Sequence, residues 1–87
     1  MKEITLTIQH EVGLHARPAA LFVKTAARFQ SNIKVIKDSS TANAKSILSI
    51  LGLAAGKGAV VTIQAEGADE DEAVAVLQAL VESNFGE

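Results

Sequence analysis

The spacing of apolar side chains switches repeatedly between two periods along these 87 residues, and this alternation limits the folds open to the chain. Residues 3–9 alternate apolar and polar side chains, which is typical of a strand with one buried face. Residues 16–29 carry apolar side chains at every third or fourth position, the period of a helix with one buried stripe. The expected inward residues are Ile4, Leu6 and Ile8 of the strand and Ala19, Phe22, Val23, Ala26 and Phe29 of the helix. A strand and a helix therefore follow one another at the start of the chain.

Three further strands are expected. β-Branched residues at 33–37 predict the second strand, and the Asp and Ser residues at 38–40 predict a turn into a short returning strand. Residues 58–67 predict the fourth, with Val61, Ile63 and Ala65 on its inward face.

Two more helices are expected around the fourth strand. One covers residues 46–54 and begins with Ser46 as its N-cap. The last begins after Asp69, which we expect to cap the helix together with Glu72 three residues later. Its inward stripe is expected to comprise Ala73, Val76, Leu77 and Leu80.

The resulting order of elements is βαββαβα. Alternating strands and one-sided helices predict an α+β open-faced sandwich, in which a four-stranded antiparallel sheet carries three helices on one face. A chain of this length supports one such unit, so residues 1–87 are expected to form a single domain.

Composition excludes several classes of function. The formal net charge is -2 and no run of Lys or Arg offsets it, which argues against nucleic-acid binding. The chain has no cysteine and no His, Asp and Glu cluster at ligand spacing, so no metal or other cofactor is expected. No apolar run reaches about 18 residues and the N-terminus lacks a signal-peptide core, so we expect a cytoplasmic protein without membrane insertion.

Polar residues gather at the predicted start of the first helix, where Ala16, Arg17 and Pro18 follow His15. Pro18 suits a first turn, because its missing N–H costs no hydrogen bond there. The unpaired amides of a first turn attract anions, and Arg17 adds a cation whose fork fits phosphate oxygens. A neutral, nucleophilic imidazole is expected at His15. The pattern predicts a nucleophile beside a phosphate-supporting helix start.

A histidine at a helix start also has a simpler interpretation, as a cap or as a partly buried ring with a backbone partner. No acid–base pair and no glycine-rich phosphate loop lies near His15 in the sequence. The chemistry left open is a histidine that accepts a phosphoryl group and passes it on. We therefore expect a stoichiometric carrier and not an enzyme with turnover.

Two segments carry a resemblance to a known family. GLHARPAALFVKTA, residues 13–26, and NAKSILSILGL, residues 43–53, resemble the histidine-containing phosphocarrier (HPr) family of the phosphoenolpyruvate-dependent sugar phosphotransferase system. The resemblance extends over the chain in length and element order, and GLHARPA is its most specific part. It implies the open-faced βαββαβα sandwich that the residues predict.

The resemblance also implies roles for three residues. His15 matches the histidine that enzyme I phosphorylates on Nδ1, with phosphoenolpyruvate as ultimate donor, and that passes the group to sugar-specific enzyme IIA domains. Arg17 matches the arginine that supports the phosphoryl group. Ser46 matches a serine that HPr kinase/phosphorylase phosphorylates in low-GC Gram-positive relatives, which slows phosphotransfer and creates a corepressor for a catabolite control regulator. Without the resemblance, the position of Ser46 is fully explained by its role as an N-cap.

The helix at residues 46–54 is apolar around most of its surface. One stripe is expected to serve the core, and the remainder is either buried under neighbouring loops or exposed as a docking patch beside His15. The resemblance favours docking. The partner contacts that it implies are Ala16, Arg17, Ala20, Lys24, Ala27, Ile47, Leu48 and Leu51.

Four positions depart from the family pattern. Ala27 stands where many relatives have a basic or polar residue, and Val12 where many have a polar one, which bears on how the preceding loop is held. Ser49 and Ala54 stand where many have glycine. The second histidine, His10, is expected to be an exposed residue at a strand end, since nothing phosphate-binding surrounds it.

Other functions remain open: a regulatory paralogue that acts through Ser46 or docking alone, an unrelated small ligand- or metal-binding domain, and a fragment of a larger phosphotransferase. The presence of His15 and Arg17 argues against the first, because docking alone needs no nucleophile. The sequence favours a monomeric carrier, and NAKSI favours the carbohydrate branch of the system over the nitrogen branch.

Overall fold

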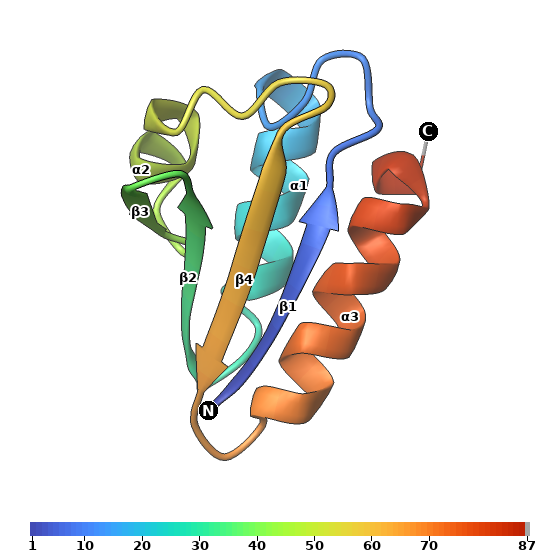
Figure 1. Ribbon diagram of the computed structural model, residues 1–87. Helices are drawn as coiled ribbons and strands as arrows, with labels where there is room; N and C mark the ends of the chain where they lie inside the picture. Colours follow the sequence, from blue (N-terminus) through green and yellow to red (C-terminus); the bar gives the residue numbers. More distant parts are fainter. Residues whose placement is uncertain (87) are drawn as a thin grey trace.

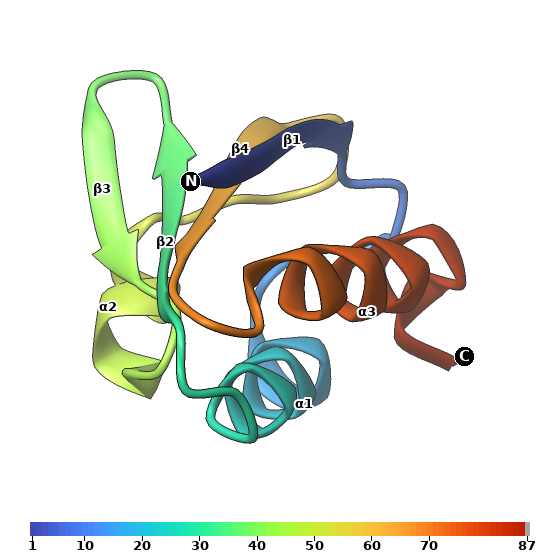
Figure 2. The ribbon, with the colours of Figure 1, turned by 90° about the horizontal axis from the view of Figure 1, so that it is seen from below.

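The computed structural model describes residues 1–86, and in it three helices lie on one face of a four-stranded antiparallel sheet (Figures 1 and 2). The elements are β1 (Lys2–Thr7), α1 (Ala16–Ala26), β2 (Asn32–Lys37), β3 (Ser40–Asn43), α2 (Ile47–Gly52), β4 (Val60–Glu66), α3 (Glu70–Glu82) and a closing 3-10 turn, Asn84–Gly86. The predicted α+β fold and the predicted order of helices and strands are confirmed.

The strands lie in the order β1-β4-β2-β3, so two edge strands flank a central pair that is distant in sequence. Ile63 of β4 stands opposite Ile4 of β1 on one side and Val35 of β2 on the other. Ile63 and Val35 are buried, and they point toward the helices as the alternating pattern predicts. The sheet register thus sets one apolar face against the helical layer.

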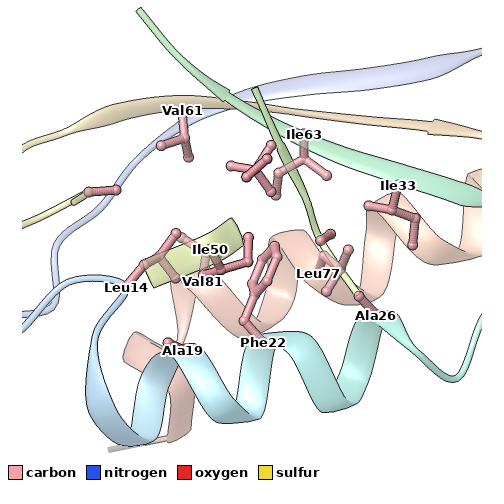
Figure 3. Close-up of a cluster of buried hydrophobic side chains, with 14 of the residues drawn as sticks. Leu14, Ala19, Phe22, Ala26, Ile33, Ile50, Val61, Ile63, Leu77 and Val81 are labelled. Carbon is pink, nitrogen blue, oxygen red and sulfur yellow. The ribbon is translucent and has the colours of Figure 1, made fainter. Parts of the chain in front are cut away.

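The core lies between the sheet and the helices (Figure 3). Phe22 points from α1 toward the sheet, beneath Ile63, with Leu77 and Val81 of α3 beside it. All four side chains are buried. Burying each of these side chains stabilises the fold by about 1.5–3 kcal/mol. This packing between the layers therefore fixes the position of α1 against the sheet.

Helix α1 ends earlier than its apolar pattern predicts. The expected end at Phe29 is wrong, because the amides of Arg28 and Phe29 bond the carbonyls of Thr25 and Ala26 in tighter turns. Phe29 is nonetheless buried, as its place in the stripe requires. The Lys45 ammonium donates to the Phe29 carbonyl oxygen at 2.6 Å, which places a cation at the negative end of α1.

Helix α3 buries a stripe shifted from the predicted one. Ala73 and Leu77 are buried as expected, but Val74 and Val81 complete the stripe. Val76 and Leu80 are half-buried at its margin. The stripe faces both the sheet and α1, which widens it beyond what one helical face predicts.

The expected cap of α3 is wrong. Asp69 occupies the N-cap position but makes no capping hydrogen bond with its side chain. Its carboxylate instead accepts hydrogen bonds from the Gln30 and Ser31 amides and from the Ser31 hydroxyl. These bonds, the hydroxyl first, hold the pKa of Asp69 below its ordinary value. The carboxylate therefore joins α3 to the segment between α1 and β2.

Gly67 makes this junction possible. Its φ is +155°, and a Cβ at this position would lie 2.7 Å from the Ser31 Cα. Its amide donates to the Glu70 carboxylate at 3.1 Å, and Glu70 also binds the N-terminal amine at 3.2 Å. The Gly67 amide and the amine together lower the pKa of Glu70.

Candidate functional site

The predicted nucleophile lies at the start of α1, where the loop from β1 enters the helix (Figure 1). His15 is the N-cap residue, with extended backbone angles of φ -132° and ψ 163°, as its place in the sequence predicts. Its side chain makes no capping hydrogen bond and is half-buried. The cap interpretation of His15 is therefore wrong for its imidazole, which is not used to close the helix.

The first turn of α1 is distorted. Ala16 has φ +50°, a left-handed conformation that costs an alanine about 1–2 kcal/mol. The opening hydrogen bond, from the Ala19 amide to the His15 carbonyl, is long at 3.4 Å. Pro18 is buried and has no N–H, so the amides that this helix start can offer to an anion are those of Ala16 and Arg17.

The loop before His15 is fixed against the segment that precedes β4. The Leu14 amide donates to the Ala55 carbonyl at 2.7 Å, and the Leu14 side chain is buried in the core. Gly13 has φ +71°, and a Cβ there would lie 2.3 Å from the Ala55 oxygen. Only glycine can lie this close to the Ala55 carbonyl, which explains why the GLHARPA run begins with Gly13.

Arg17 lies two residues after the nucleophile with its side chain exposed. Its neighbours Pro18 and Ala19 are buried and fix the turn from which it extends. A guanidinium, two helix-start amides and an imidazole thus share one turn, an arrangement suited to holding a phosphoryl group on nitrogen.

The implied partner-contact residues lie at the surface. Ala16, Ala20 and Lys24 of α1 and its C-cap Ala27 are exposed. On α2, Leu48 is 79% exposed and Ile47 38%, while Leu51 is half-buried and Ile50 serves the core. The alternative of full burial under neighbouring loops is wrong for Ile47 and Leu48. Helices α1 and α2, which carry these residues, contact one another.

Ser46 is the N-cap of α2, as predicted. Its Oγ accepts a hydrogen bond from the Ser49 amide at 3.3 Å. Asn43 holds the preceding turn, because its carbonyl accepts from the Ser46 amide and its side chain from the Lys45 amide. The Ser46 side chain is half-buried, so part of it remains at the surface.

His10 departs from its expected exposed position. Its ring packs edge-to-face on Phe85 with centroids 5.8 Å apart, and its Nδ1 accepts a hydrogen bond from the Val12 amide at 3.1 Å. Val12 itself is exposed. The period of the sequence could not indicate this contact, because it joins residues at opposite ends of the chain.

None of the helices within residues 1–86 is long and apolar enough to cross a membrane. Over the same residues, no three His, Cys, Asp or Glu side chains gather as a metal site.

Comparison with known proteins identifies the family. The family described as "PTS HPr component phosphorylation site" matches residues 2–83. Phosphocarrier protein HPr of Neisseria meningitidis serogroup A is 41% identical over 87 residues, which cover all of this chain and 98% of that protein.

Two solved structures extend this similarity to the fold. HPr of Thermoanaerobacter tengcongensis superimposes with a TM-score of 0.98 at 55% identity, covering 100% of this chain and 98% of that one. Crh, the catabolite repression protein of Bacillus subtilis, which was crystallised as a swapped dimer, superimposes with a TM-score of 0.76 at 43% identity, covering 97% of both chains. The chain belongs to the HPr family, the phosphocarriers of the phosphotransferase system.

Proposed function

We propose that His15 accepts a phosphoryl group from enzyme I, with phosphoenolpyruvate as ultimate donor, and passes it to sugar-specific enzyme IIA domains. The observation that carries this proposal is the half-buried His15 imidazole, which occupies the N-cap position of α1 without capping it. A ring left out of the helix-closing hydrogen bonds is available to an external phosphorus atom.

The proposed step is a displacement at phosphorus. The Nδ1 lone pair of His15 attacks the phosphorus, the bond between phosphorus and the donor atom of enzyme I breaks, and that donor atom keeps the electron pair. The Arg17 guanidinium and the amides of Ala16 and Arg17 support the charge on the phosphoryl oxygens, and Pro18 fixes their turn. In this proposal the protein acts as a stoichiometric carrier, and the transfer uses no cofactor.

The exposed residues of α1 and α2 form the proposed docking surface for enzyme I and the enzyme IIA domains. Leu48 and Ile47 supply exposed apolar area on α2, and Lys24 and Arg17 of α1 supply charges that suit acidic partners. The replacement of a basic or polar residue by Ala27 removes one such contact at the edge of this surface.

Phosphorylation of Ser46 by an HPr kinase/phosphorylase is the proposed regulation. The hydroxyl is half-buried and stands at the start of α2, directly before Ile47 of the docking surface. A phosphate there places negative charge against acidic partners and slows transfer from enzyme I, and the same charge serves recognition by a catabolite control regulator.

A regulatory protein that lacks the carrier role is the second candidate. The similarity to Crh, a catabolite repression protein, favours it. The two functions are distinguished by phosphoryl acceptance at His15.

The proposed working form is a cytoplasmic monomer whose residues 1–87 make up one HPr domain. Crh has been crystallised as a swapped dimer, and that assembly is the alternative. Light scattering during size-exclusion chromatography decides between them, and a mass of two chains at micromolar concentration would overturn the monomer.

Intact-mass measurement tests the carrier function directly. The chain is mixed with enzyme I, magnesium and phosphoenolpyruvate, and its mass is recorded before and after brief acid treatment. One acid-labile phosphoryl group is expected on the parent and none on His15→Ala. An unmodified parent, with an enzyme I that phosphorylates another carrier, would leave the regulatory function as the better account.

A further inference from the structure

The five residues that lead from the buried Ile8 to the buried Leu14 form the support of the His15 turn. Both ends are fixed, because the Ile8 amide bonds the Ala59 carbonyl at 2.8 Å and the Leu14 amide bonds the Ala55 carbonyl at 2.7 Å. The residues between these two anchors join β1 to the His15 turn, and their conformation has to fit both anchors.

His10 organises the middle of this loop through two hydrogen bonds. Its carbonyl accepts from the Gly13 amide at 3.0 Å, and its Nδ1 accepts from the Val12 amide at 3.1 Å. One residue thus accepts hydrogen bonds from two consecutive amides of the segment that leads into the His15 turn. The side-chain bond has the form of an Asx turn, in which an acceptor two bonds from Cβ receives the amide two residues on.

The His10 ring is itself held from the other end of the chain. It packs edge-to-face on Phe85, at an interplanar angle of 78°, and Phe85 is only 3% exposed. Phe85 belongs to the 3-10 turn that follows α3 and contacts both α3 and α1. In Figures 1 and 2 the loop before α1 lies beside this end of the chain. The His10 ring therefore has a contact with the core in addition to its bond within the loop.

We propose that His10 is a positioning residue for phosphoryl transfer, which sets the orientation of the His15 ring through the Val12 and Gly13 amides. This inference rests on the proposed carrier function of His15. The side chain of Val12 is apolar, and the His10 imidazole supplies the acceptor for the Val12 amide from two residues upstream.

A pair of variants separates the hydrogen bond from the packing. His10→Asn keeps an acceptor at the same number of bonds from Cβ as Nδ1, so it preserves the Val12 bond. His10→Phe keeps an aromatic ring against Phe85 but has no acceptor. If His10→Phe does not fold, His10→Leu takes its place as the variant without an acceptor. Thermal unfolding of each variant verifies that it is folded at the assay temperature.

Three quantities are measured on each variant: the single-turnover rate of phosphoryl acceptance from enzyme I, the hydrogen-exchange rate of the Val12 amide, and the NMR shifts of the His15 ring. We expect His10→Phe to slow acceptance by about threefold to tenfold, since small misplacements of a reacting group are costly. Its Val12 amide should exchange faster and its His15 ring signals should move. His10→Asn should retain the parent values in all three.

Acceptance by His10→Phe at the parent rate with unchanged His15 signals would overturn the positioning role. A His10→Asn variant as slow as His10→Phe would also overturn it, since the rescue rests on the acceptor. If the parent itself accepts no phosphoryl group, the carrier function fails instead. The Val12 exchange and the His15 signals then still decide whether His10 orients the ring.

Discussion

At the scale of single residues, two alanines adopt a left-handed backbone conformation. Ala16 has φ +50° inside the nucleophile turn, and Ala54 has φ +53° directly after Leu53, the C-cap of α2. Both conformations favour glycine. At Ala16 the strain lies between His15 and Arg17, whereas at Ala54 it lies directly after the end of α2.

Ala54→Gly is expected to stabilise the protein. Removing the left-handed alanine gains about 1–2 kcal/mol, from which the added freedom of the unfolded glycine subtracts about 0.4–1 kcal/mol. The midpoint of urea unfolding should therefore rise. Ala75→Gly makes the same chemical change on the exposed side of α3 and should lower stability by about 1 kcal/mol. Equal shifts for the two variants would contradict the backbone argument.

Arg17→Ala is expected to slow phosphoryl acceptance about tenfold to a hundredfold, because one charged donor to the phosphoryl oxygens is lost. Arg17→Lys keeps the charge but not the fork, and should fall between the parent and Arg17→Ala. Stability should change by less than about 0.5 kcal/mol, since the side chain is exposed. Quenched-flow labelling gives the rates, and parent-like transfer by Arg17→Ala would remove Arg17 from the site.

At the scale of elements, α2 divides its apolar residues between two tasks. Ile50 is fully buried, whereas Leu48, two positions earlier, is 79% exposed. Residues two positions apart lie on opposite sides of a helix, so on this six-residue helix Ile50 faces the core and Leu48 faces outward. Leu48 buries little of its surface within the chain, so its side chain is available to a partner.

Leu48→Ala is expected to leave stability within about 0.5 kcal/mol of the parent and to weaken binding of enzyme I about fivefold. Ile50→Ala, its buried neighbour on α2, should instead cost about 2–5 kcal/mol of stability. Titration calorimetry and urea unfolding measure the two effects. Parent-like binding by Leu48→Ala would place the docking surface elsewhere.

Element types could be predicted from the sequence because their signals are local. Period, caps and turn residues locate α1 and α2, including His15 and Ser46 at their N-caps. The strand order β1-β4-β2-β3 has no such local signal, because β1 and β4 pair although most of the chain lies between them in sequence. The same holds for Asp69, whose carboxylate bonds to Ser31 and does not cap its own helix. It also holds for the contact of His10 with Phe85, which is made in addition to the local bond to the Val12 amide.

At the scale of the whole molecule, the end of the sheet remote from His15 is tied together by carboxylates. Asp69 joins α3 to the segment after α1 through the Gln30 and Ser31 amides. Glu70 joins α3 to the N-terminal amine and to Gly67. Both carboxyl groups have lowered pKa values, because the folded chain donates hydrogen bonds to their ionised forms.

Acid is therefore expected to loosen the contacts of α3 with the rest of the fold. A carboxyl group whose pKa is lower in the folded than in the unfolded state stabilises the fold at pH values above its unfolded pKa. That stabilisation is lost as the pH falls from the ordinary value of 3.8 for Asp69 through its lower folded value. Asp69→Asn should consequently be less stable than the parent at pH 7, and the difference should shrink below about pH 4.

Asp71→Asn is the matched control, since it removes a neighbouring carboxylate whose one ion pair, with Lys2, is exposed and 4.0 Å long. Such a pair contributes little, so this variant should follow the parent across the pH range. Urea unfolding at several pH values between 3 and 7 measures all three proteins. A constant difference between Asp69→Asn and the parent would mean that Asp69 acts through the shape of its side chain, because a loss of charge-dependent hydrogen bonds has to vanish once the carboxyl group is protonated.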